Sequence, residues 1–465
     1  MSGGKTKIKT NRRRAFGGLL KTIEDMGKKN RLTNGNITTG LVRFAIPLLL
    51  GSMLQQMYGM ADILFVSRCL GTKASAAVGA SSTIVTCLIG LFTGISMGAG
   101  VIIGNYRGAQ KKKEEKSSMK AALYISIVGG LAIMLGGLAM SRQILEWMET
   151  PKEILELALV YIRIYFLAIP MMILYNISAA VFQALGDSKR PVLMLALGGA
   201  LNVGCNALLI VVIPLGVVGA GVATLISQGI SALLLCYSLI KQEKLMEVRG
   251  EPFQVYIPKI LKIGVPAGIQ AVILTLSNLF VQYHINIIGE DAVAAFTIYY
   301  KIENFIYMPI VAFGQAMLVF TSQNMGAGNP KRVWKGMRTC YVISGLTTIV
   351  LSFGFILLSK EMMCVFAKDN AVVEAGSRIM HIIFPWYIIY SMMEVTSAFI
   401  RGIGKTGSAM LLSMLFLCGS RVLFLQMFSF WFKGIEGVAT IYPVTWILAL
   451  LAYGTYSFWL KKEIR

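Results

Sequence analysis

Long apolar segments constrain the fold of this chain more than any other feature of its sequence. A helix needs about 20 apolar residues to cross about 30 Å of bilayer hydrocarbon, and the 465 residues contain twelve such segments. Only 14% of the residues are charged, against about 25% in soluble domains. The sequence therefore predicts an all-α polytopic membrane protein and excludes a water-soluble enzyme. The twelve predicted spans lie near residues 41–66, 76–104, 118–140, 155–182, 191–213, 216–240, 259–288, 292–321, 336–358, 378–400, 408–431 and 437–460.

The basic residues indicate how these spans are oriented. The chain has 44 Lys and Arg against 22 Asp and Glu, and most of the basic residues fall in a tail over residues 1–40, a linker over residues 241–258 and the loops on the same side. Because Lys and Arg are enriched in cytoplasmic loops, we expect both termini in the cytoplasm. The distribution favours anchoring of the lipid bilayer against a basic surface, and it does not favour a nucleic acid as partner.

The chain is also written twice, with a shift of 218 residues between the copies. Each half carries six predicted spans, so the N-lobe covers residues 41–240 and the C-lobe covers residues 259–465. Because six is even, both lobes begin on the same side of the membrane. Three landmarks have the shift of 218 and a fourth has a shift of 216, and they are Gly71 and Gly289, Gly108-Ala109 and Gly326-Ala327, Gly186 and Gly404, and Gly221-Val222-Ala223-Thr224 and Gly437-Val438-Ala439-Thr440.

Such a repeat predicts two pseudo-symmetric six-helix bundles around a central cavity. Rocking of one bundle against the other would expose that cavity to each side of the membrane in turn. This architecture favours a secondary transporter. A channel more often takes its symmetry from several short subunits, and a membrane enzyme has no need of the duplication.

Polar residues inside the N-lobe spans are candidate functional residues, because ionisable groups are costly in lipid. Gln55, Tyr58 and Asp62 fall at i, i+3 and i+7, which predicts one polar face on the first helix. Asn202 and Asn206 lie one turn apart on the fifth span. The C-lobe has mostly apolar residues at the matching positions, which favours a functional role over a scaffold role. Asp62 with amide oxygens suits a dehydrated cation, a proton, or a buried post that joins helices.

The C-lobe offers a second acidic site. Glu303 lies among aromatic residues that include Tyr299 and Tyr300, and such a setting suits an organic cation through charge and cation–π attraction. The alternative is an ion pair with a basic neighbour such as Lys301. Glu394 on the tenth span could serve the same substrate, or it could pair with Arg421.

Motifs of known enzymes are missing. Gly404-Lys405-Thr406 resembles the end of a P-loop, but that motif needs a glycine where Phe399 stands and a strand before it. The zinc motif HExxH and the nucleophile elbow do not occur, and the chain has only two histidines. We therefore predict that the protein is not an enzyme and has no cofactor.

In their order and spacing these features resemble the multidrug and toxic compound extrusion (MATE) family, over nearly the whole chain after residue 40. The chain is most similar to the bacterial branch that contains MepA-type and DinF-type pumps. The resemblance rests on Pro47 fifteen residues before Asp62, the Asp62–Gly71 ending of the first span, the Gly108-Ala109 and Gly326-Ala327 turns, Gln183-Ala184-Leu185-Gly186 and Gly221-Val222-Ala223-Thr224.

The resemblance implies efflux of organic, often cationic compounds across a bacterial cytoplasmic membrane, driven by Na⁺ or H⁺. It places the coupling ion in the N-lobe, with Asp62 as the charged ligand and Asn202 and Thr224 as neutral oxygens. Tyr58 and Pro47 would accompany bending of the first helix, with Pro47 as its hinge.

Asn206 departs from the family pattern, because many relatives have Asp there. The choice between Na⁺ and H⁺ therefore stays open, and a Na⁺ site would consist of Asp62, Asn202, Asn206 and Thr224. We expect a monomer that exchanges this ion for small organic cations. The residues predicted to bind the substrate are Gln55, Tyr299, Tyr300, Glu303 and Glu394. A flippase of lipid-linked or native metabolites and a non-transporting scaffold are the alternatives.

Overall fold

The computed structural model describes residues 32–247, 252–428 and 434–463, and within these ranges the chain forms helices and no strand. Most of the predicted basic tail, residues 1–31, lies outside the described residues. The first span begins at Ile37, four residues before the predicted boundary.

The first half of the chain contains six long helical segments. The first five are α2 (Ile37–Phe65), α3 (Gly71–Gly108), α4 (Lys112–Trp147), α5 (Lys152–Ala184) and α6 (Lys189–Asn206), and the sixth is α7 (Val217–Gln242). Two π-helical turns, η1 (Val66–Leu70) and η2 (Ala207–Val212), follow α2 and α6. The predicted linker contains the two 3₁₀ turns η3 (Leu245–Glu247) and η4 (Phe253–Tyr256).

The second half repeats this order with more interruptions. Its helices are α8 (Ile257–Ile288), α9 (Glu290–Gly326), α10 (Pro330–Leu357), α11 (Ser359–Phe366), α12 (Asn370–Ile383), α13 (Tyr387–Gly402), α14 (Thr406–Leu412), α15 (Ser420–Phe428) and α16 (Ile435–Glu463). The 3₁₀ turn η5 (Phe384–Trp386) joins α12 to α13, and the π-helical turn η6 (Ser413–Gly419) joins α14 to α15.

Twelve spans can be counted in this order. Eleven helical runs are long and apolar enough to cross a membrane, and one of them, Ile37–Gly108, has 72 residues and holds both α2 and α3. Gly71 separates these two helices with φ +83°, a backbone conformation that favours glycine. The predicted all-α polytopic fold is confirmed.

Glycines with positive φ also show the internal repeat. The pairs Gly71 and Gly289, Gly186 and Gly404, and Gly216 and Gly434 each lie 218 residues apart, and all six residues have positive φ. A side chain at such a position would strain the backbone. The repeat therefore preserves the same turns at the same places in both halves.

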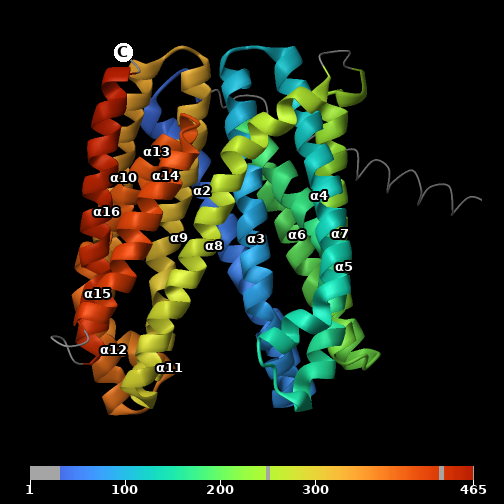
Figure 1. Ribbon diagram of the computed structural model, residues 1–465, viewed down its shortest axis with the longest axis vertical. Coiled ribbons are helices and arrows are strands. Elements are labelled where there is room, and N and C mark those ends of the chain that lie inside the picture. The colour runs from blue at the N-terminus through green and yellow to red at the C-terminus, as the bar shows by residue number, and fades with distance from the viewer. Residues whose placement is uncertain (1–31, 248–251, 429–433, 464–465) are drawn as a thin grey trace, which may run out of the picture.

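The two halves form two bundles that exchange one helix crossing each (Figure 1). Leu41 and Phe44 of α2 are buried in the core of the second half rather than in that of the first. In the opposite direction, α8 crosses the molecule and packs along α3. The lobes are therefore joined by α2 and α8 as well as by the linker.

Small residues form the seam between the bundles. A Cβ added to Gly94 of α3 would lie 2.0 Å from the backbone N of Gly268 in α8, and one added to Gly108 would lie 1.8 Å from the carbonyl O of Gln323 in α9. Gln323 also donates from Nε2 to the carbonyl O of Ala184 at 2.7 Å. These contacts close the seam toward the end of the molecule that carries the 108–112 and 326–330 turns.

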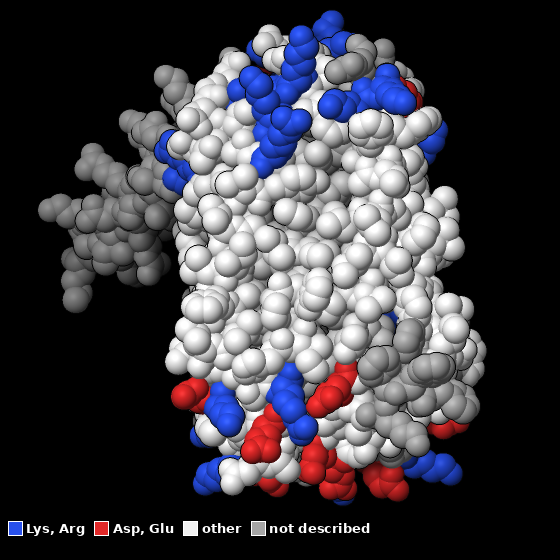
Figure 2. Space-filling model, turned by 90° about the vertical axis from the view of Figure 1, so that its left-hand side faces the viewer, with Lys and Arg blue, Asp and Glu red and all other residues white. Residues whose placement is uncertain are grey.

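We call this end, with the turns at 108–112, 184–189, 326–330 and 402–406, the basic end. Figure 2 shows that Lys and Arg gather there, whereas the opposite end carries both signs of charge. The middle band of the visible face is almost free of charged residues. This pattern is that of a protein that spans a bilayer.

Candidate functional site

The acidic residue of the first span lies in a cluster with two asparagines of the fifth. Asp62 is near the end of α2, and Asn202 and Asn206 are in the last two turns of α6. The Nδ2 atom of Asn206 donates to Oδ1 of Asp62 at 2.7 Å and to Oδ1 of Asn202 at 3.1 Å. Both asparagines are buried. The structure thus brings together three of the four residues predicted to hold a coupling ion.

The remaining residues predicted for this site make other contacts. The hydroxyl of Thr224 donates to the carbonyl O of Ala220 within α7, at 3.2 Å. Tyr58, one turn before Asp62, accepts a hydrogen bond at 3.3 Å from Nε2 of Gln228. Sequence reasoning missed Gln228, although its position one turn after Thr224 was a signal of a polar face on that helix.

Two features of this N-lobe cluster suit it to a small cation. The Oδ1 atom of Asn206 is buried and accepts no hydrogen bond from any described residue, and buried polar atoms usually have a partner. The π-helical turn η2 begins directly after Asn206, and such turns are frequent at functional sites. Amide and carboxylate oxygens are the ligands that hard cations prefer.

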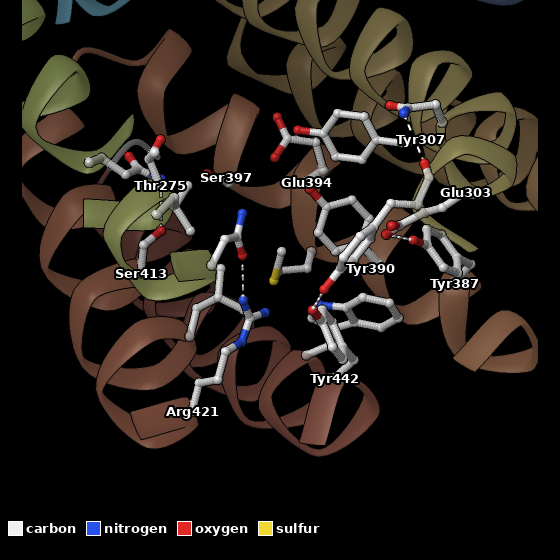
Figure 3. Close-up of a pocket in the computed structure, with 18 of the residues that line it drawn as sticks. Thr275, Glu303, Tyr307, Tyr387, Tyr390, Glu394, Ser397, Ser413, Arg421 and Tyr442 are labelled. Atoms are coloured by element: carbon white, nitrogen blue, oxygen red, sulfur yellow. Dashed lines mark hydrogen bonds between the residues drawn. The ribbon is translucent and has the colours of Figure 1, made fainter. Parts of the chain in front are cut away.

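The second half encloses a cavity of about 590 Å³ (Figure 3). Its lining comes mainly from α8, α9, α13 and α16, with Thr86 of α3 as the contribution of the other bundle. Three of the five predicted substrate residues, Tyr300, Glu303 and Glu394, line it. Tyr299 does not, because its ring is fully buried against Phe384, with 5.6 Å between centroids.

The fifth predicted substrate residue, Gln55, lines a smaller cavity of about 300 Å³ with Asn304 and Tyr307 of α9. Both of these α9 residues also line the large cavity. Gln55 therefore faces the C-lobe, whereas Tyr58 and Asp62 contact α7 and α6. Helix α2 thus has one polar side toward each lobe.

Glu303 has no basic partner among the described residues. Its carboxylate accepts a hydrogen bond from the hydroxyl of Tyr387. The alternative partner, Lys301, is exposed and lies over the ring of Phe366, with 5.8 Å from Nζ to the centroid. The expected ion pair between Lys301 and Glu303 is therefore wrong, because residues two positions apart on a helix face different ways.

Glu394 forms an ion pair, but with a different residue from the one suggested. Its Oε1 lies 2.6 Å from an Nη atom of Arg401, two turns further along α13. Nη1 of Arg401 also approaches the sulfur of Met97 in the other bundle, at 4.0 Å. The pairing of Glu394 with Arg421 is wrong, because Arg421 lies on α15 and donates from Nη1 to Oδ1 of Asn278 at 3.0 Å.

Aromatic rings form much of the remaining wall of the cavity. Trp446 of α16 lies 4.9 Å from the ring of Tyr387 and 5.1 Å from that of Tyr390. The hydroxyls of Tyr300 and Tyr442 are 2.9 Å apart. A wall of this kind can bind a flat apolar ring while the carboxylates attract its positive charge.

Sequence reasoning missed the stripe of polar residues on α13. Its spacing follows the helical repeat, as in the first span, so the signal was present in the sequence. The stripe consists of Tyr387, Tyr390, Glu394, Ser397 and Arg401.

Comparison with known proteins agrees with this architecture. The family model MatE matches residues 47–208 and 266–425, one segment in each half. Among the curated relatives, the probable multidrug resistance protein YpnP of Bacillus subtilis (strain 168) is 29% identical over 444 residues, which cover 93% of this chain and 98% of that protein. The multidrug export protein MepA of Staphylococcus aureus (strain MRSA252) is 24% identical and covers 80% of both chains.

Solved structures have the same fold. An outward-facing multidrug resistance MATE family transporter of the MOP superfamily superposes with a TM-score of 0.87 at 22% identity, over 94% of this chain and 99% of its own. A MATE crystal structure in the bent conformation superposes with a TM-score of 0.86, also at 22% identity, over 94% and 97% of the two chains.

Proposed function

This chain belongs to the MatE family of membrane transporters, and on that premise we propose that it is a secondary active antiporter for multidrug efflux. It exports organic compounds with a positive charge in exchange for Na⁺ or H⁺. The observation that carries this proposal is the separation of two acidic sites. Asp62 lies in a polar cluster of one bundle, and Glu303 lies in an aromatic cavity of the other.

The N-lobe cluster binds the coupling ion in this proposal. Asp62 supplies the charge, and Asn202 and Asn206 supply amide oxygens, one of which has no hydrogen-bond donor among the described residues. For Na⁺ these oxygens, with Thr224 after a rotation of its hydroxyl, replace the hydration shell. For H⁺, Asp62 alone carries the proton, and Asn206 orients its carboxyl group.

Helix α2 connects the ion to the substrate. Its Asp62 faces the cluster, and its Gln55 faces the cavity that borders Tyr307. Repacking of α2 around Pro47 when the ion binds therefore changes the wall that the substrate contacts. Antiport needs only that ion and substrate favour different states of this helix.

The protein lies in a bacterial plasma membrane as a monomer in this proposal, with the basic end in the cytoplasm. The seam between α3 and α8 is closed toward that end. The structure then corresponds to an outward-open state, ready to exchange substrate for the ion.

The test is export of a fluorescent organic cation from proteoliposomes under separately imposed Na⁺ and pH gradients. We expect the wild type to export under one gradient, which names the ion, and Asp62→Asn to lose at least about 90% of this rate, because a coupling ion needs the carboxylate. Glu374→Gln, which removes an exposed carboxylate from α12, is the matched control and keeps the wild-type rate.

Two results would contradict the proposal. Full gradient-driven export by Asp62→Asn would show that its carboxylate is structural. Absence of export by the wild type under both gradients would favour the flippase or the scaffold. A lipid-linked pyrophosphate fits the cavity less well, because Glu303 and Glu394 would repel it.

A further inference from the structure

Arg421 is a buried cation in the wall of the C-lobe cavity with capacity left for a ligand. Its residue is 4% exposed, and it lines the cavity from α15. Nη1 donates to Oδ1 of Asn278, and the guanidinium lies over the ring of Tyr442 at 4.8 Å. Its Nε is buried and has no hydrogen-bond partner among the described residues.

No carboxylate neutralises this guanidinium within the described part of the chain. Glu303 lies across the cavity from Arg421 in Figure 3, and the two residues form no ion pair. Glu394 is already occupied by Arg401 at 2.6 Å. An arginine stays protonated, and a buried charge without a partner is unfavourable. The cavity therefore holds one uncompensated positive and one uncompensated negative group on separate walls.

We infer that Arg421 is an anion subsite, and that the preferred substrates are flat aromatic zwitterions. The carboxylate of such a substrate binds the free Nε side of Arg421, and its amine binds Glu303. Its ring system lies against the aromatic wall around Trp446. This inference rests on the proposed function and narrows its substrate class.

The charges argue against ligands of a single sign. A simple organic cation satisfies Glu303 but leaves Arg421 unpaired beside it. An anion satisfies Arg421 but approaches Glu303 and Glu394. Only a ligand with both charges neutralises both walls, and each charge-assisted hydrogen bond contributes about 1.5–3 kcal/mol, which is about tenfold or more in affinity.

The experiment compares two dyes that differ in one group. One is an aminoxanthene dye with a free carboxylate, which is a zwitterion, and the other is its methyl ester, which is a cation. Binding to purified full-length protein is measured by fluorescence polarisation, and export is measured from proteoliposomes. We expect the wild type to bind the zwitterion about tenfold more tightly than the ester, from the contacts that Arg421 adds.

Variants assign the preference to single residues. Arg421→Gln keeps a donor for Asn278 and is expected to remove the roughly tenfold preference by weakening the zwitterion only. Arg421→Lys keeps the charge and retains part of the preference. Glu303→Gln weakens both dyes. Lys301→Gln, which removes an exposed charge two residues from Glu303, is the matched control and changes neither affinity.

The outcomes separate this inference from the proposed function. Equal affinity of the wild type for both dyes, or an unchanged preference in Arg421→Gln, overturns the anion subsite, while gradient-driven export of the ester keeps the antiporter. A preference that depends on Arg421 supports the subsite. If that preference appears without gradient-driven export of either dye, the subsite stands and the antiporter fails.

Discussion

At the scale of single residues, both candidate sites depend on an uncharged side chain that positions a carboxylate. Asn206 donates to Asp62 in one bundle, and Tyr387 donates to Glu303 in the other. Because these donors carry no charge, the carboxylates keep their attraction for a cation. Each donor can be removed without changing the charge of its site.

Asn206→Leu is expected to weaken the response to the coupling ion. The substitution removes the hydrogen bond at 2.7 Å from Asp62 and one oxygen of the cluster, a loss of about 1.5–3 kcal/mol. The concentration of coupling ion at half-maximal export should rise roughly tenfold or more. An unchanged value would show that Asn206 only packs against α2.

Tyr387→Phe is expected to weaken substrate binding, with little change in the coupling-ion response. The ring against Trp446 remains, but Glu303 loses its donor, so the dissociation constant of a cationic dye should rise roughly tenfold. Tyr283→Phe, at a position that is 60% exposed, is the control. Equal effects of the two substitutions would contradict this role of Tyr387.

At the scale of helices, the seam depends on close approach of α3 to α8. Gly94→Ala would place a Cβ 2.0 Å from the backbone N of Gly268, so the two helices must separate. We expect a loss of about 1–3 kcal/mol and a lower melting temperature in a thermal-shift measurement. Gly79→Ala lies on the same helix, where an added Cβ meets nothing within 4 Å, and it should melt like the wild type.

The helices also show how far a sequence can be interpreted. The stripe from Tyr387 to Arg401 has the same periodicity as the stripe from Gln55 to Asp62, so both were visible in the sequence. The pairing of Glu394 with Arg401 was not expected, because two turns of helix separate them. Arg401 reaches back along α13, and the crossing of Met97 from the other bundle accompanies this conformation.

At the scale of the whole molecule, antiport requires the seam at the basic end to open. A cross-link through this seam should therefore stop transport. Gly104 of α3 and Ser322 of α9 suit this test, because a Cβ on Gly104 would lie 3.3 Å from Cβ of Ser322, close to the separation in disulfides.

The double variant Gly104→Cys and Ser322→Cys is expected to lose nearly all export when oxidised and to regain it on reduction. The native cysteines are first replaced, and export is assayed before and after a reductant. A matched cross-link joins Gly198 to Ser231 inside one bundle, also with 3.3 Å between the Cβ positions, and should leave export intact. Export by the oxidised seam variant would show that transport does not need the seam to open.

The sequence by itself determined the twelve spans, their repeat and the residues that are costly to place in lipid. These properties depend on the hydrophobicity of each segment and on spacings of three or four residues along one helix. Only the tertiary structure decided that α2 and α8 exchange bundles, that Asp62 meets Asn206, and that Arg421 faces a cavity without a carboxylate partner. Contacts between residues more than a hundred positions apart depend on how each helix is rotated and crossed, and packing of all the helices together sets those angles.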